Sequence, residues 1–129
     1  MIVKDGRVLL ARRTGGQRAG WYGWIGGRLE FGETLQACAR REAREEAGID
    51  ITHLRLLCVS TIIMADQHWI DVEFLADIAS GEPRTVRPDE IAEWAWHPLD
   101  ALPEPLFEPA AYALEAYRSG RVLNEPGEP

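Results

Sequence analysis

Three glutamates, Glu42, Glu45 and Glu46, stand within five positions of one another, just before Gly48. On a helix, residues three and four apart lie on the same side, so the three carboxylates would share one face. Glu42 and Glu46 would repel each other. All three would also lie near the C-terminal end, where the helix dipole disfavours a negative charge by roughly 0.3 to 1 kcal/mol. This arrangement predicts a cation beside the three side chains.

The glutamate face of this helix is also predicted to be its buried face. The same side carries Leu35, Cys38 and Ala39 one or two turns earlier, whereas Arg40 and Arg44 lie on the opposite side. An acidic run on a helix is usually a solvated surface. Here the carboxylates continue the apolar stripe, and a buried charge is costly unless it is paired. The position therefore favours a functional site over a solvated face.

A divalent metal ion is the cation that we expect at this site. Arg41 lies on the flank of the helix, where we expect it to neutralise one carboxylate but not three. Carboxylate oxygens are ligands that Mg²⁺ and Mn²⁺ prefer, and Mg²⁺ commonly joins a few carboxylates to substrate phosphates. Such an ion activates water and neutralises charge on a transferring phosphoryl group. The residues alone thus indicate metal-assisted phosphate chemistry.

The helix that carries these glutamates has clear boundaries in the sequence. It is predicted over residues 34–47, with Thr34 as the N-cap and Gly48 as the residue that ends it. The preceding segment, residues 14–27, is rich in glycine and aromatic residues and is predicted to be a loop leading into a short strand. The helix is therefore entered from a flexible, aromatic loop.

Strands are predicted on both sides of this helix, because apolar and polar residues alternate there. They form a hairpin over residues 1–13 with its turn at Asp5 and Gly6, a pair over residues 54–65 and 68–78, and a strand over residues 91–99. A loop over residues 80–90 precedes the last of these. This order of elements indicates an α/β fold, with helices packed on a mixed sheet.

The chain is predicted to end with a helix and a loose tail. The closing helix covers residues 108–119, with Pro109 near its start and Gly120 after its end. The tail covers residues 121–129, which leaves a single domain over residues 1–120.

Composition narrows the class of protein. The 129 residues are 46% apolar and 27% charged, a balance typical of one globular domain rather than a disordered chain. No apolar run is long enough for a membrane span. The N-terminus becomes charged before any long apolar stretch, unlike a secretory signal, so we expect a cytoplasmic protein. The net charge of -7 argues against binding a nucleic-acid polymer, although nine of the fourteen basic residues lie in residues 1–44. That uneven charge suits a small phosphorylated ligand.

The stretch "GRLEFGETLQACARREAREEAGI", residues 27–49, resembles the Nudix box, whose pattern is G-x5-E-x7-R-E-U-x-E-E-x-G-U with U aliphatic. Every fixed position matches, at Gly27, Glu33, Arg41, Glu42, Glu45, Glu46 and Gly48. "GRVLLARR", "WYGWIGG" and "DEIAEWAWHPLDALP" also resemble family segments, so the likeness extends over most of residues 2–118. Ile25 departs from the family pattern, which usually has proline there.

The resemblance implies the Nudix α/β/α sandwich, a mixed sheet between helices with the box forming a loop, a helix and a loop. It also implies Mg²⁺-dependent hydrolysis of a diphosphate linkage, with Mn²⁺ as a substitute. By the same likeness, the metal ligands would be the Gly26 carbonyl and Glu42, Glu45 and Glu46, with Glu90 or Glu93 as an additional carboxylate. One of Glu42, Glu45 and Glu46 could act as the base, while Glu33 and Arg41 would orient the carboxylates.

Among family branches the chain most resembles the small MutT-like nucleoside triphosphate diphosphatases, which release a nucleoside monophosphate and pyrophosphate. A nucleotide-sugar or ADP-ribose diphosphatase is the alternative, and a non-catalytic nucleotide-binding module is a further one. Arg12 and Arg28 are candidates for contacting phosphates. Tyr22 and Trp24 are candidates for stacking on a base, against the alternative of core packing.

The first strand is short for the family. Either the chain is truncated, or another subunit covers the edge of the sheet, as in a homodimer.

Overall fold

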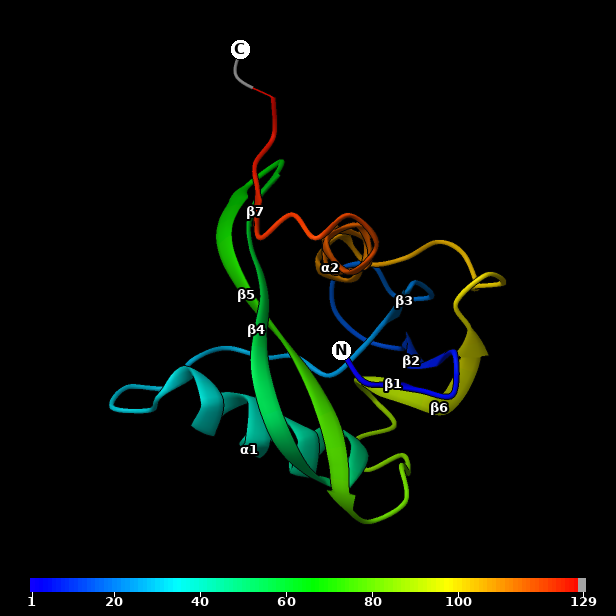
Figure 1. Cartoon of the computed structure of the whole chain (residues 1–129). Helices are drawn as coiled ribbons and strands as arrows, with labels where there is room; N and C mark the ends of the chain where they lie inside the picture. The colour runs from blue at the N-terminus through cyan, green and yellow to red at the C-terminus, as the bar shows by residue number, and fades with distance from the viewer. Residues whose placement is uncertain (128–129) are drawn as a thin grey trace.

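Two β-sheets and two helices make up the computed structural model of the chain, which describes residues 1–127 (Figure 1). Helix α1 (Leu35–Ala47) and helix α2 (Glu108–Ser119) pack into different core clusters. Neither helix of the described chain is long and apolar enough to cross a membrane. The predicted α/β/α sandwich is confirmed, but its strands form two sheets where we expected one mixed sheet.

The first sheet is built around β2, which pairs antiparallel with three other strands. Its members are β1 (Val3–Lys4), β2 (Arg7–Arg13), β3 (Tyr22–Gly23) and β6 (Ile91–Pro98). The second sheet has the order β5-β4-β7. Its members are β4 (Asp50–Met64), β5 (Gln67–Ser80) and β7 (Leu123–Asn124), with β5 antiparallel and β7 parallel to β4.

The short strand β1 joins the two sheets. Its hairpin turn is at Asp5 and Gly6, as predicted, and both residues have positive φ, 52° and 73°, which is the requirement of a type I′ turn. On the other side of β1, Ile2 forms a parallel bridge to Ala76 of β5, and the Ala76 N–H donates to the Met1 carbonyl at 3.1 Å. This edge, for which the sequence left truncation or cover by another subunit as alternatives, is bridged at Ile2 by β5 of the same chain.

Strand β2 separates the environments of the two helices, because its side chains alternate in direction. Val8 and Leu10 are fully buried in a cluster with Leu114 and other residues of α2. Leu9 points the other way, into a cluster with Ala43 and Ala47 of α1. One strand thus positions both helices, and with them both sides of the site.

Helix α1 has the boundaries that the sequence predicts. The Thr34 hydroxyl accepts a hydrogen bond from the Ala37 N–H at 3.1 Å, which caps the N-terminus. Gly48 ends the helix in a left-handed conformation with φ of 65°, and its N–H donates to the Arg44 carbonyl at 3.1 Å. Leu35, expected on the buried face, is 46% exposed at the first position of the helix.

Part of the predicted loose tail is ordered. Leu123 and Asn124 form β7, and the Val59 N–H donates to the Val122 carbonyl at 2.7 Å. Asn124 is 4% exposed, and its side-chain Nδ2 donates to Ser60 Oγ at 3.4 Å. The edge of β4 offers backbone groups that need partners, and the tail supplies them. Residues 128 and 129 of the predicted tail lie outside the described residues.

We expect Asn124→Ala to lower the free energy of unfolding by about 1 to 3 kcal/mol, because the substitution empties a buried position and leaves the Ser60 hydroxyl without its donor. Urea unfolding followed by circular dichroism measures the change. Arg121→Ala is the matched control, since Arg121 is an exposed residue of the same segment. Equal free energies of unfolding for the two variants would show that the contacts of Asn124 in β7 do not stabilise the fold.

Candidate active site

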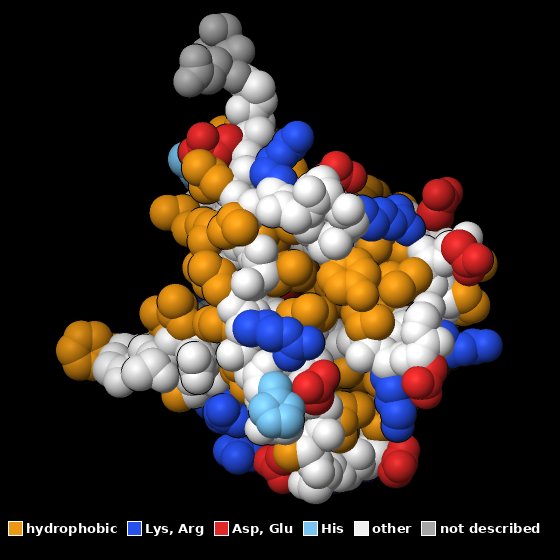
Figure 2. Space-filling model, viewed as in Figure 1, with side chains coloured by type: hydrophobic (Ala, Val, Ile, Leu, Met, Phe, Trp, Pro, Cys, Tyr) orange, Lys and Arg blue, Asp and Glu red, His pale blue; other side chains and the backbone are white. Residues whose placement is uncertain are grey.

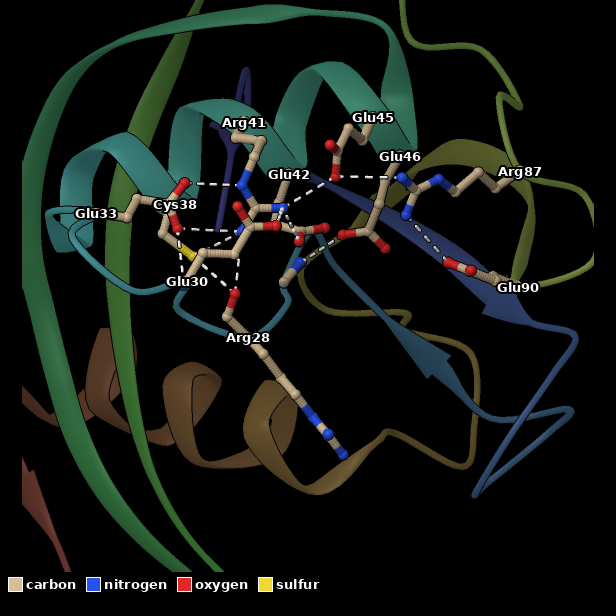
Figure 3. Close-up of polar contacts among 11 residues, drawn as sticks. Arg28, Glu30, Glu33, Cys38, Arg41, Glu42, Glu45, Glu46, Arg87 and Glu90 are labelled. Carbon is tan, nitrogen blue, oxygen red and sulfur yellow. Dashed lines mark hydrogen bonds and ion pairs between the residues drawn. The ribbon is translucent and has the colours of Figure 1, made fainter.

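The three glutamates of α1, labelled in Figure 3, lie along one helix. They differ in burial. Glu42 and Glu46 are 8% and 5% exposed, as predicted for the inner face of the helix. The side chain of Glu45 is 34% exposed, so it lies at the edge of that face. Two buried carboxylates one helical turn apart, with a third beside them, therefore form the centre of the site.

Glu46 is the carboxylate with the least favourable surroundings. The Gly26 N–H donates to its Oε1 at 2.9 Å, which ties the loop before α1 to the helix. Burial, together with the neighbouring charge of Glu42, raises the pKa of Glu46 to about 8. Without a cation, the ionised form is therefore disfavoured at this position.

Arg41 contacts three carboxylates at once. Its Nε donates to Glu33 at 2.7 Å, and one Nη donates to Glu42 at 2.7 Å and to Glu45 at 3.0 Å. These partners raise the pKa of the guanidinium, and in return Arg41 lowers the pKa of Glu33 to about 2. Of the three glutamates of α1, Arg41 thus contacts Glu42 and Glu45, one more than expected, because the planar guanidinium carries five N–H donors that point in different directions.

The loop that precedes α1 is held by the same arginine. The second Nη of Arg41 donates to the Arg28 carbonyl at 3.0 Å, and the Cys38 thiol donates to the same oxygen at 3.6 Å. The side chain of Arg28 extends away from the glutamates (Figure 3). Arg28 therefore contributes its backbone to the glutamate network, and its charge lies elsewhere in the cavity.

Arg87 is a member of the site that the sequence analysis missed. It lies in the loop between β5 and β6, 3.3 Å from Glu45 and 3.5 Å from Glu90. Glu90 is thereby placed beside the glutamates, whereas Glu93, the other candidate, pairs with Arg12 at 3.4 Å. The three-residue spacing from Arg87 to Glu90 could have suggested that pair. The contact of Arg87 with Glu45 depends on the path of the loop between β5 and β6, which no sequence pattern predicts.

A cavity of about 1050 Å³ opens beside the glutamates and is walled by residues of both sheets. Glu42, Glu46 and Glu90 lie at one part of it, and β5 forms another wall. Arg13 also lines it, with its guanidinium 4.0 Å above the centre of the Phe107 ring, and burial lowers the pKa of Arg13. The cavity thus brings acidic, basic and aromatic groups to one space.

The four candidates for substrate contact do not all reach this cavity. Arg28 and Trp24 line it, but Trp24 is only 8% exposed and donates from Nε1 to Glu73 at 3.2 Å, so core packing explains its position. Tyr22 is not among the lining residues and packs edge-on against His97. Arg12 is also absent from the lining, because alternation along β2 turns Arg13 inward instead.

The donor atoms at this site fit a divalent metal ion. Glu42 and Glu46 are buried neighbours of like charge, and carboxylate oxygens are hard ligands. Within residues 1–127, no three acidic, histidine or cysteine side chains converge as a ready-made metal cage. Glu42 and Glu45 are turned toward arginines. A cation bound by all three glutamates would therefore replace the contacts that Arg41 and Arg87 make with Glu42 and Glu45.

The raised pKa of Glu46 makes stability depend on pH. Its pKa is 4.5 in the unfolded chain and about 8 in the fold, so its contribution is fully present below pH 4.5 and is lost as the pH rises towards 8. We expect Glu46→Gln to be more stable than the parent at pH 8 by about 2 kcal/mol or more, at roughly 1.4 kcal/mol per pKa unit. At pH 5 the two should differ little.

Urea unfolding at pH 5 and pH 8, without divalent ions, tests this expectation. Glu82→Gln is the matched control, because Glu82 is an exposed loop residue. A stability difference between Glu46→Gln and the parent that is the same at both pH values would contradict the assignment.

Known proteins share both the sequence and the structure of this chain. A family model described as NUDIX domain matches residues 1–117. The chain is 36% identical over 110 residues to the NAD-capped RNA hydrolase NudC of Vibrio atlanticus, covering 80% of this chain but only 37% of that relative. It is 33% identical over 105 residues to the oxidized purine nucleoside triphosphate hydrolase of Danio rerio, covering 80% of this chain and 65% of the relative.

A solved structure agrees with these relatives. The MutT NUDIX hydrolase from Burkholderia pseudomallei superposes with a TM-score of 0.86 and 41% sequence identity, over 89% of this chain and 91% of that one. The family match, the arrangement of the box residues and the fold all point the same way. The chain belongs to the Nudix family of hydrolases.

Proposed function

We propose that this Nudix hydrolase cleaves nucleoside triphosphates to a nucleoside monophosphate and pyrophosphate, with Mg²⁺ as the cofactor. The observation that carries the proposal is the buried pair Glu42 and Glu46, which opens on a cavity of about 1050 Å³. Pockets of roughly 300 to 1,000 Å³ suit ligands of this size. The similarity to a MutT NUDIX hydrolase and to a nucleoside triphosphate hydrolase supports the triphosphate as substrate.

Nudix hydrolases generally use divalent metal ions, and Mg²⁺ is our choice because the side-chain donors are carboxylates. The residues that would hold it are Glu42, Glu45, Glu46 and Glu90 together with the Gly26 carbonyl. When bound, it would neutralise charge on the phosphates and make a bound water more acidic. Mn²⁺ has the same preference for oxygen ligands and could substitute for it.

The protein's own groups have separate roles in this proposal. Glu42 or Glu45 accepts the proton of the water that attacks phosphorus, because both carboxylates lie beside the cation site. Arg41 fixes the direction of these two carboxylates, and Glu33 in turn holds Arg41 with two hydrogen bonds of 2.7 and 3.1 Å. Glu33 and Arg41 are positioning residues, since their contacts run to other side chains of the site.

Gly27 is needed for Glu42 to reach its place. A Cβ atom at position 27 would lie 2.2 Å from the Glu42 carboxylate, a separation that real atoms do not adopt. The carboxylate therefore lies directly against the backbone of the loop. Any side chain at position 27 would push Glu42 away from the cation site.

We expect Gly27→Ala to lower kcat by roughly 100-fold, the effect of moving a reacting group by about 1 Å. Steady-state kinetics with a nucleoside triphosphate and Mg²⁺ measure the change, and thermal unfolding shows whether the fold is kept. Gly127→Ala is the matched control, because nothing lies within 4 Å of a Cβ there. Full activity of Gly27→Ala would show that the position of Glu42 is unimportant.

A second candidate function is cleavage of a diphosphate that joins a nucleoside to another group, as in a nucleotide sugar, ADP-ribose or a dinucleotide. The similarity to the NAD-capped RNA hydrolase NudC favours it. The net charge of -7 gives little support to binding of the RNA itself. The products separate the candidates, since only triphosphate cleavage releases pyrophosphate.

We expect Glu45→Gln to abolish turnover, because the amide can neither accept the proton nor supply a full negative charge to the cation. The assay uses a panel of nucleoside di- and triphosphates, nucleotide sugars and dinucleotides with Mg²⁺ and with Mn²⁺, and both products are identified. Glu82→Gln is the control. An unchanged rate in Glu45→Gln would refute the proposed mechanism, and an inactive parent would favour a nucleotide-binding module.

A further inference from the structure

The loop that follows β2 lies against the segment that carries Glu90. The pairing of β2 with β6 runs to the last residue of β2 and the first residue of β6. Beyond that pair, the N–H groups of Thr14 and Gly15 both donate to the Glu90 carbonyl, at 2.9 and 3.4 Å. The backbone contacts between the two strands thus continue to the residue that we propose as a metal ligand from outside the box.

The backbone of Glu90 is also held from its own side of the chain. The N–H groups of Glu90 and Ile91 donate to the Arg87 carbonyl at 3.0 and 2.9 Å, which closes a tight turn. The Thr14 hydroxyl donates to the Pro88 carbonyl at 2.8 Å and ties this turn to the loop after β2. Both backbone polar groups of Glu90 are therefore bonded, and Glu90 lines the cavity from a fixed backbone.

Gly15 allows the loop and the turn to approach this closely. A Cβ atom at position 15 would overlap the Asp89 carbonyl oxygen and lie 3.7 Å from the Glu90 Cα. The overlapping atom belongs to the backbone, which cannot rotate aside as the end of a side chain can. The φ of Gly15 lies outside the left-handed region, so a side chain is excluded here by lack of space alone. Any side chain at position 15 would displace the turn that carries Glu90.

The side chain of Glu90 depends on this backbone for its direction. It is 57% exposed, and its carboxylate pairs with Arg87 at 3.5 Å (Figure 3). An exposed ion pair of this kind contributes little to holding a side chain in one place. Arg87 also contacts Glu45, at 3.3 Å, so its charge is shared between two carboxylates. The position of the Glu90 carboxylate is therefore set mainly by where its backbone lies.

We propose that Gly15 and Thr14 are positioning residues, which place the Glu90 carboxylate where it can bind the metal ion together with the glutamates of α1. The inference rests on the proposed function in one respect, namely that Glu90 is a metal ligand. Glu90 lines the same cavity as Glu42 and Glu46, although it comes from a distant segment of the chain. Replacing a group that holds a metal ligand in place commonly lowers the affinity for the metal by roughly 10- to 100-fold.

Binding of Mn²⁺ to the metal-free chain at pH 7.5, followed by electron paramagnetic resonance of the free ion, tests the assignment without turnover. We expect Gly15→Ala to bind Mn²⁺ roughly tenfold more weakly than the parent, as Glu90→Gln should, because both variants take the same carboxylate from the site. The double variant should bind no more weakly than Glu90→Gln alone, since a carboxylate can be lost only once. An unchanged affinity in either single variant, or losses that multiply in the double variant, would overturn the proposal.

Two variants of Thr14 give a second measurement that introduces no steric overlap. Thr14→Val removes the hydroxyl at similar size and should weaken Mn²⁺ binding roughly two- to threefold, the effect of one exposed hydrogen bond. Thr14→Ser keeps the hydroxyl and should bind Mn²⁺ as the parent does. An equal affinity of Thr14→Val and the parent would contradict the role of Thr14.

Circular dichroism shows whether each variant keeps its fold. Gly127→Ala is the matched control for Gly15→Ala, because nothing lies within 4 Å of a Cβ there, and its affinity for Mn²⁺ should equal that of the parent. If Gly15→Ala does not fold, the comparison of Thr14→Val with Thr14→Ser decides, and equal affinities of these two variants would overturn the proposal.

The binding experiment separates failure of this inference from failure of the proposed reaction. Mn²⁺ binding that is equal in the parent and in Gly15→Ala, with pyrophosphate released from a triphosphate, would remove only the role of the loop after β2. The expected losses of Mn²⁺ affinity in a protein that releases no pyrophosphate would remove the proposed reaction and leave the positioning of Glu90 in place. A parent that binds no Mn²⁺ would overturn both this inference and the proposed metal site.

Discussion

The arrangement of the site depends on one guanidinium group. Arg41 joins Glu33, Glu42 and Glu45 to the carbonyl of Arg28, and so connects the loop before α1 to two turns of the helix. Each of these carboxylates would repel the others if the arginine were absent. Arg41 therefore keeps the negative charges close together before a metal ion arrives, and lowers the cost of having them there.

The fold serves this network by leaving space between its sheets. Strand β2 buries Val8 and Leu10 toward α2 and Leu9 toward α1, so the two helices are fixed by the same few residues. The second sheet meets the first through the bridge from Ile2 to Ala76. Between them remains the cavity, with α1 supplying acidic groups at one part and β5 forming another wall. Figure 2 shows hydrophobic side chains uncovered on one face of the molecule. Among the large exposed hydrophobic residues, Leu29, Leu35 and Ile70 line the cavity.

Local features of this fold could be predicted well from the sequence. Thr34 and Gly48 mark α1 through capping, and Asp5 with Gly6 mark the hairpin turn, because these signals act within a few residues. The buried face was predicted correctly for Glu42 and Glu46 from helical spacing alone. The division into two sheets depends on how distant strands pair, which no local pattern records.

Contacts between distant segments account for the other differences. Arg87 reaches Glu45 from a loop more than forty positions away, and the choice between Arg12 and Arg13 depends on which side of β2 faces the cavity. Trp24 looked like a stacking residue because it precedes the box, but Glu73 offers its indole a buried partner. In each case the residue type was informative, and its direction was decided by tertiary packing.

The pairing of β7 has a consequence for the opposite side of its sheet. Asn124 lies beside Ser60 in the register of β7 with β4, and Ser60 in turn lies opposite Asp71 in the register of β4 with β5. The C-terminal segment is thus two strands away from the wall of the cavity that β5 forms. A fusion or affinity tag that pulls β7 off β4 would loosen the support of that wall, so the shape of the cavity depends on how the C-terminal segment is handled.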